Sequence, residues 1–167
     1  MLRILLQETF VVEDLWWYKP TVDSDFTRTT SGSEYVYTLN NPVALPSAPF
    51  EIKFTTTRQS TSNGVVYFSI GDTNTWYDIG ALRNKGSLSI RKVIGNLSNS
   101  SLLADQNSNN VIPLAETENT YTYNGSKHTV TSGSTTLTAN ETTTISYFRI
   151  VTVNPNCTLK EIKVKAL

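Results

Sequence analysis

Residues 50–57 read FEIKFTTT and alternate apolar with polar side chains. Successive side chains of an extended strand point to opposite faces, so Phe50, Ile52 and Phe54 share one face and the polar residues share the other. Such a run is typical of a strand that packs one face on a core and exposes the other to solvent. The stretch therefore predicts a half-buried strand of an antiparallel sheet.

The same alternation recurs in three later runs. Their apolar faces are formed by Val66, Phe68 and Ile70 in GVVYFSIG, by Leu88, Ile90 and Ile94 in SLSIRKVI, and by Ile162, Val164 and Ala166 in KEIKVKAL. Residues 143–153, TTISYFRIVTV, are instead apolar on both faces. This pattern predicts a central strand that is covered on both sides.

Turn residues separate these runs. Asn124-Gly125 and Ser132-Gly133 predict two consecutive hairpins within residues 121–138, because Asn and Gly both tolerate a positive φ. Residues 96–110, NLSNSSLLADQNSNN, form the most polar and least patterned segment, which predicts a long loop at one end of the molecule.

The composition favours strands and turns. Thr (25), Ser (17) and Asn (15) together make up a third of the 167 residues, and the helix formers are scarce. We expect ten to thirteen strands and an all-β fold, a two-sheet antiparallel β-sandwich of the jelly-roll type. We expect residues 1–167 to form a single β-sandwich domain.

Charge and cysteine content exclude several classes of function. A net charge of zero and a pI near 6.6 exclude a nucleic-acid partner, which needs a basic surface. One Cys and one His can form neither an internal disulfide nor a Cys/His zinc site. The first apolar run, residues 1–6, is too short for membrane insertion and has no signal-peptide cleavage site. We expect no metal and no other cofactor.

The order of segments resembles the concanavalin A-like, or laminin G-like, jelly-roll superfamily. The resemblance covers about two thirds of the chain and rests on PFEIKFTTT (49–57), GVVYFSIGD (64–72), WYDIGAL (76–82), GSLSIRKV (86–93), TYTYNGSKHTVT (120–131), ISYFRIVTV (145–153) and LKEIKVKAL (159–167), with LLQETFVVEDLWWYK (5–19) as a first strand. It implies a sandwich scaffold for glycan or cell-surface recognition. Members include lectins, carbohydrate-binding modules, adhesion domains, glycoside hydrolases and viral or phage attachment heads, so the fold alone does not decide the function.

The carboxylates predict no catalytic pair. The hydrolase branch of this superfamily carries Glu-x-Asp-x-x-Glu on one strand, and that spacing does not occur here. Glu13 and Asp14 are adjacent and would point to opposite faces of a strand, while Asp23 and Asp25 lie in a turn-rich segment. We therefore expect no enzyme activity.

The single histidine and cysteine have structural interpretations. His128 follows the Asn124-Gly125 turn without an acidic neighbour, and we interpret it as a solvated hairpin histidine. Cys157 has no His nearby and is interpreted as a small packed or edge residue.

Trp76 is the residue with the strongest functional signal. If Tyr77, Ile79 and Ala81 form the core face of WYDIGAL, Trp76 lies on the opposite face among polar residues. Sugars stack on flat aromatic rings while polar side chains hold their hydroxyls. The predicted ligand-binding residues are therefore Trp76, Asp72, Asn74, Asp78 and Arg83. Residues 72–78 lack the dense run of acids of a calcium loop, so we expect an Asx-rich turn there.

Two functional hypotheses remain open. The leading one is a non-enzymatic module that recognises cell-surface carbohydrate or a related receptor, as in a viral or phage receptor-binding tail fibre or a microbial adhesin. The alternative is a structural module of a virion, tail or surface layer that contacts other protein subunits. Both place the protein on a virion, outside the cell or at the cell surface. Ligand identity and assembly into a homo-oligomer are left open by the sequence.

Overall fold

The computed structural model describes residues 15–17, 26–58, 65–82, 87–106, 111–153 and 157–167. These residues form thirteen strands and no helix, which confirms the all-β prediction. None of the described segments is a helix able to cross a membrane. The strands are β1 (Leu15–Trp17), β2 (Phe26–Ser31), β3 (Glu34–Ala44), β4 (Phe50–Arg58), β5 (Val66–Gly71), β6 (Thr75–Ala81), β7 (Leu88–Ile94), β8 (Asn96–Asp105), β9 (Thr117–Tyr123), β10 (Lys127–Ser132), β11 (Thr135–Asn140), β12 (Tyr147–Val153) and β13 (Cys157–Ala166).

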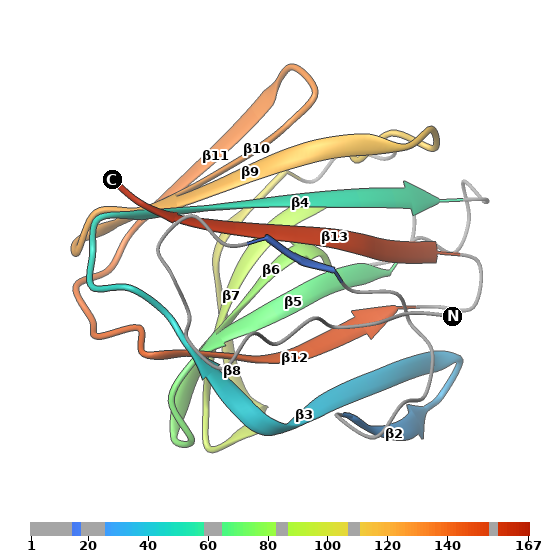
Figure 1. Cartoon of the computed structure of the whole chain (residues 1–167), viewed down its shortest axis with the longest axis horizontal. Coiled ribbons are helices and arrows are strands. Elements are labelled where there is room, and N and C mark those ends of the chain that lie inside the picture. Colours follow the sequence, from blue (N-terminus) through green and yellow to red (C-terminus); the bar gives the residue numbers. More distant parts are fainter. Residues whose placement is uncertain (1–14, 18–25, 59–64, 83–86, 107–110, 154–156) are drawn as a thin grey trace.

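The strands form two antiparallel sheets that pack face to face, as predicted for a jelly-roll sandwich (Figure 1). One sheet has six strands in the order β1-β13-β4-β9-β10-β11, and the other has seven in the order β2-β3-β12-β5-β6-β7-β8. The hairpins β9–β10 and β10–β11 confirm the two turns predicted within residues 121–138. Some neighbouring strands are distant in sequence. The two last strands pair with strands from the first half of the chain, β13 with β4 and β12 with β5.

The alternating apolar residues form the core between the sheets. Those predicted from the four runs are buried, apart from Ile94 and Ala166 at strand ends. Phe68 of β5 is the centre of an aromatic cluster, with its ring 5.0 Å from Phe54, 5.7 Å from Phe148 and 6.1 Å from Tyr121, centroid to centroid. Because Phe54 and Tyr121 belong to the six-stranded sheet, Phe68 links both layers.

The loop predicted for residues 96–110 is wrong over most of its length. Asn96–Asp105 forms β8, an edge strand that pairs with β7. Most of its side chains are exposed, so no apolar alternation marks it in the sequence. Residues 107–110 lie outside the described part of the chain.

The central strand predicted within residues 143–153 is confirmed for residues 147–153. Strand β12 lies between β3 and β5, and its register shifts between Phe148 and Ile150. Phe148 is in the core, and Tyr147 points the other way, as the alternation predicts, but it is 42% exposed and so is not covered. Ile145 precedes the strand and packs into the core with Phe148, so the predicted phase fails for Ile145.

His128 is buried and not solvated, so that interpretation is wrong. It has no exposed surface. Its ring lies 4.6 Å from the Tyr77 ring and 4.7 Å from the Tyr123 ring, and Nδ1 is 2.8 Å from the Tyr121 hydroxyl. The residue shares the inward face of β10 with Val130, so strand alternation outweighs the nearby turn. Burial lowers the pKa of His128 to about 4.

Cys157 is a packed residue, which is one of the two alternatives predicted for it, packed or at an edge. The side chain is buried at the start of β13, opposite Arg58 of β4. Burial raises the pKa of the thiol to about 11, so it stays protonated at neutral pH.

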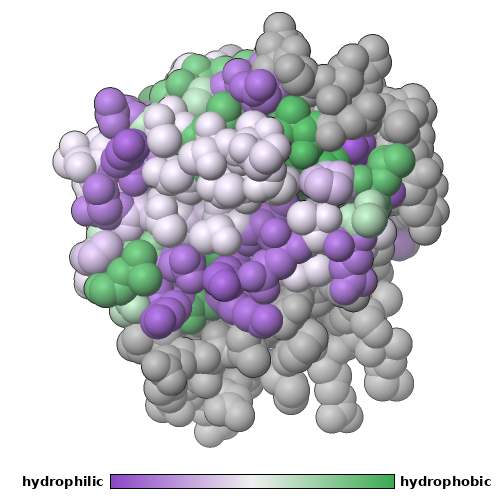
Figure 2. Space-filling model, turned by 90° about the horizontal axis from the view of Figure 1, so that it is seen from above, coloured by the Kyte–Doolittle hydropathy of each residue, from purple (hydrophilic) through white to green (hydrophobic). Residues whose placement is uncertain are grey.

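The outer face of the six-stranded sheet is dominated by threonine. Two register rows cross β9, β10 and β11: Thr120, Thr131 and Thr136 form one, and Thr122, Thr129 and Thr138 form the other. Figure 2, which views the molecule from the side of these strands, shows a broad near-neutral field bordered by hydrophilic residues. On the same face, Lys53 and Lys163 both pair with Glu118 of β9. The two threonine rows themselves carry no charge.

The first prediction concerns the core. Phe68→Ala removes the ring that contacts both sheets and should lower the free energy of unfolding by about 3–5 kcal/mol. The control is Leu97→Ala on β8, where the side chain is 56% exposed and the cost should stay within about 0.5 kcal/mol. Urea unfolding of both variants measures the difference. Equal small costs would show that Phe68 is not the centre of the core.

The second prediction concerns pH. Because the pKa of His128 is about 4 in the folded chain and ordinarily about 6.5, only the unfolded chain binds a proton between these values. Stability should therefore fall as pH drops from 6.5 towards 4, by up to about 3 kcal/mol. His128→Gln removes this titration from both states, so its unfolding free energy should vary less with pH over this window. Identical pH profiles for the two proteins would contradict the prediction.

Candidate functional site

Trp76 lies on the outer face of the seven-stranded sheet, as the alternation predicted. Tyr77, Ile79 and Ala81 of the same strand, β6, are fully buried in the core. Trp76 points to the opposite face and is half-buried. A large ring is therefore partly exposed on a surface where the core does not require it.

An arginine from a distant strand packs against this ring. The guanidinium carbon of Arg149, on β12, lies 5.3 Å from the centre of the Trp76 ring. Its Nη1 donates a hydrogen bond to the main-chain oxygen of Asp72. A guanidinium over an indole is attracted by the negative face of the ring, so Arg149 covers one face of Trp76 and holds the ring in place.

A buried carboxylate fixes the same ring from below. Asp78 is only 1% exposed. Its Oδ1 accepts a hydrogen bond from Ser69 at 2.5 Å, and its Oδ2 accepts two from Arg91 at 2.9 and 2.5 Å. The Trp76 side chain also hydrogen-bonds to Asp78. Burial raises the pKa of Asp78, and Arg91 opposes that rise. Both oxygens of Asp78 are thus engaged within the protein.

The hairpin that precedes Trp76 is an Asx turn, as predicted. Asp72 Oδ1 accepts hydrogen bonds from the main-chain nitrogens of Thr75 at 2.6 Å and Asn74 at 2.7 Å. These two bonds lower the pKa of Asp72. The side chains of Asp72 and Asn74 are exposed on the turn that leads into β6, the strand that carries Trp76. The Asp72 carboxylate thus holds the turn, and the described residues contain no group of three His, Cys, Asp or Glu suited to a metal.

A glycine separates Trp76 from a second exposed aromatic ring. In the sheet register, Gly71 of β5 is paired with Trp76 on one side and with Tyr147 on the other. Gly71 has a φ of 142°, and a Cβ atom there would lie 2.4 Å from the Thr75 oxygen and 2.6 Å from Trp76 Cα. The position therefore requires glycine. The side chain that lies between the two aromatic residues is that of Arg149, which reaches from β12 to the Trp76 ring.

A cleft opens at the end of the sandwich beside Tyr147. It has a volume of about 290 Å³. It lies between the β3–β4 connection and the segment before β12, which run side by side in Figure 1. Its lining consists of Ala44, Leu45, Pro46, Ser47, Ala48, Tyr123, Thr143, Thr144, Ile145, Ser146 and Tyr147.

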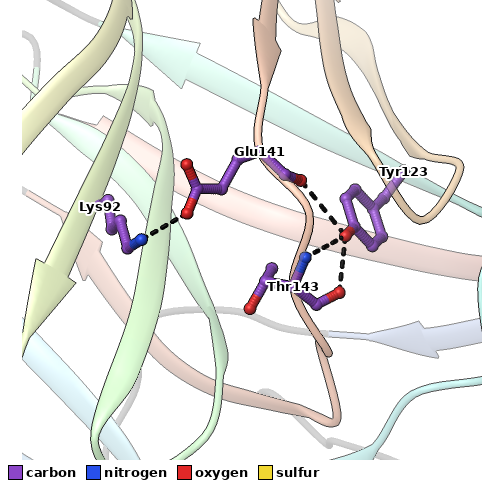
Figure 3. Close-up of polar contacts among 4 residues, drawn as sticks. All are labelled: Lys92, Tyr123, Glu141 and Thr143. Atoms are coloured by element: carbon purple, nitrogen blue, oxygen red, sulfur yellow. Dashed lines mark hydrogen bonds and ion pairs between the residues drawn. The ribbon is translucent and has the colours of Figure 1, made fainter.

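Both sheets hold one wall of this cleft in place (Figure 3). Lys92, from the seven-stranded sheet, forms an ion pair with Glu141. Tyr123, from the six-stranded sheet, accepts a hydrogen bond from Thr143 N at 2.9 Å and donates one to Thr143 O at 2.6 Å. The segment that begins at Glu141 is therefore anchored at two successive points.

The structure brings four of the five predicted ligand-binding residues onto one hairpin. Trp76 is partly exposed, Asp72 and Asn74 are exposed, and Asp78 is buried beneath. Arg83 lies outside the described residues.

Sequence reasoning missed three further residues at this site. They are Arg91, Tyr147 and Arg149. No local pattern points to them, because neighbouring strands of the sheet bring them to Trp76.

Solved structures with the same fold are lectin and carbohydrate-binding domains. The metal-free VIP36 exoplasmic/lumenal domain matches with a TM-score of 0.58 and 12% identity over 93% of this chain and 85% of that one. The Bacillus subtilis carbohydrate binding module CBM66 matches with a TM-score of 0.53 and 9% identity over 89% of this chain and 92% of that one. The Caenorhabditis elegans galectin LEC-6 matches with a TM-score of 0.53 and 12% identity over 82% of this chain and 99% of that one.

No protein-family model and no curated protein sequence matches the chain. At identities of 9–12%, the structural matches establish the fold. That fold is the jelly-roll sandwich of these lectin and carbohydrate-binding domains, the fold that the resemblance noted in the sequence implied.

Proposed function

We propose that this chain is a non-enzymatic carbohydrate-recognition module whose ligand stacks on Trp76. The observation that carries the proposal is a half-buried indole ring on the outer sheet face, held by Asp78 below and by Arg149 at its side. The fold supports it, since the matching structures include a Ca²⁺- and mannose-bound form of the VIP36 domain and a carbohydrate binding module.

The arrangement suits the chemistry of a sugar. A pyranose presents a C–H face that packs on an aromatic ring, and its hydroxyls need fixed donors and acceptors at the rim. The exposed side chains of Asp72 and Asn74 supply such groups on the hairpin next to Trp76. Asp78 acts through Trp76, because its oxygens are already engaged. The proposal routes no contact through a metal.

We place this module at a surface, outside the cell or in a secretory compartment. The VIP36 domain is exoplasmic or lumenal. An attachment protein of a virus or phage, or a microbial adhesin, is the setting we propose for it. The Thr-, Ser- and Asn-rich, charge-poor composition suits such an exposed position.

The threonine face of the six-stranded sheet favours a second candidate function. Its two rows of threonines are uncharged, as the centre of a face that contacts another protein subunit would be. A structural module of a virion, tail or surface layer would use this face. Sedimentation of the purified chain separates the two functions, since subunit contacts through the threonines would give assemblies and glycan recognition alone would not.

The third prediction tests the stacking ring. Trp76→Ala should remove about 2 kcal/mol of glycan affinity, which weakens binding about thirtyfold. Because the ring is only half-buried, the melting temperature should fall by no more than a few degrees. A glycan array and a thermal melt measure the two effects, with Leu97→Ala as the control. An unfolded Trp76→Ala variant would mean that the ring is a core residue, and an unchanged array would remove the proposed site.

The fourth prediction concerns turnover. A broad panel of glycosidase and esterase substrates should show no rate above buffer, because Asp78 is held in internal hydrogen bonds and the Asp72 carboxylate accepts two main-chain hydrogen bonds of its turn. The release of chromogenic leaving groups measures this. A rate that is abolished by Asp72→Asn or Asp78→Asn would overturn the non-enzymatic proposal.

A further inference from the structure

We propose that the binding site extends from Trp76 across Gly71 to Tyr147 and into the cleft at the end of the sandwich. Its ligand is then a neutral oligosaccharide of at least three units, with single sugars bound much more weakly. This inference rests on the proposed carbohydrate recognition and names the length and charge of the ligand.

The sheet register places the two aromatic residues in one row. Gly71 is paired with both Trp76 and Tyr147, so the two residues are separated by two strand spacings, about 10 Å. Tyr147 is 42% exposed, and its neighbour Phe148 points into the core, so Tyr147 faces the same side as Trp76. One pyranose ring cannot stack on both side chains at this separation, whereas a short chain of sugars can.

The surface between the two rings carries hydrogen-bond donors. Gly71 is buried and adds no side chain there. Arg149, two residues beyond Tyr147 on β12, extends to the Trp76 ring and so crosses this surface. Its planar guanidinium carries five N–H groups, of which one is given to the Asp72 carbonyl. Donors in a fixed plane between two aromatic residues suit the hydroxyls of a sugar that passes over Arg149.

Tyr147 continues this row into the cleft. The residue lines the cleft, whose volume of about 290 Å³ is at the small end of the range of ligand pockets. That size suits one terminal sugar unit. The walls are fixed before any ligand binds, because Leu45 N donates to Ser146 O at 2.8 Å and Tyr123 holds Thr143 through two hydrogen bonds. The hydroxyls of Ser47 and Thr144 are part of the lining.

The composition of the cleft indicates the charge of its occupant. None of its lining residues carries a charged side chain. A carboxylate, phosphate or ammonium group inside it would lose hydration without gaining a counter-charge, which is costly. Hydroxyl and aromatic groups instead match an uncharged sugar, so a neutral chain is favoured over an acidic one.

A chain-length series tests the inference. The probes are neutral oligosaccharides of mannose, glucose, galactose and N-acetylglucosamine from one to five units, printed on an array and then titrated by ligand-observed NMR. For the sugar that binds, affinity should rise at least tenfold from one unit to three. Tyr147→Ala should abolish this rise, Tyr147→Phe should retain most of it, and Leu97→Ala should retain all of it.

The outcomes separate this inference from the function on which it rests. If single sugars bind as tightly as longer chains, or if Tyr147→Ala keeps the rise with length, the extended site is wrong while recognition at Trp76 stands. A preference for uronic-acid chains over neutral ones would likewise overturn the inference alone. Absence of binding by the wild-type chain at every length would overturn the proposed function, and the extended site with it. Thermal melts of each variant show that the changes act on a folded domain.

Discussion

Aromatic packing between the two sheets is the constraint on which the other features depend. Phe68 contacts Phe54 and Tyr121 of the facing sheet and Phe148 of its own, so it fixes which face of each strand is turned inward. Because side chains alternate along a strand, this choice also decides which residues reach the surface. Trp76 is on the outer face because Tyr77 is committed to the core. A shift of one residue in β6 would exchange the two.

The core and the outer face are therefore coupled through backbone geometry. Phe148 of β12 packs on Phe68 while its neighbour Arg149 extends towards Trp76, and the register of the strand shifts between Phe148 and Ile150. Local irregularities of this kind re-aim side chains, and they occur often beside functional sites. Gly71 contributes in the same way, since its positive φ and missing side chain let the Trp76 backbone approach closely. The same few strands thus determine which side chains pack inside the sandwich and which lie on its outer face.

Most of the fold follows from residues that obey the period-two rule, and the failures have identifiable causes. Phe50, Ile52 and Phe54 predict β4 by their alternation. A core position for Tyr77 predicts that Trp76 points to the outer face. Strand β8 escaped prediction because an edge strand with exposed polar faces carries no apolar period. The Asn124-Gly125 turn suggests a solvated His128, but the strand face that His128 shares with Val130 decides its burial. Arg149 could not be found, since its partner is more than seventy residues away and only the β5–β12 pairing brings them together.

The candidate site is organised before a ligand arrives, and this bears on how a shallow surface can bind. Trp76 is fixed by Asp78 and Arg149, and Asp78 is itself fixed by Ser69 and Arg91. Ordering a mobile side chain on binding costs about 0.5–1.5 kcal/mol, which a pre-fixed ring avoids. The ring is instead ordered during folding, when the Asp78 carboxylate is buried. Burial of this charge is unfavourable, as the raised pKa of Asp78 shows. The Asp78–Arg91 ion pair is thus part of the geometry that holds the partly exposed Trp76 ring.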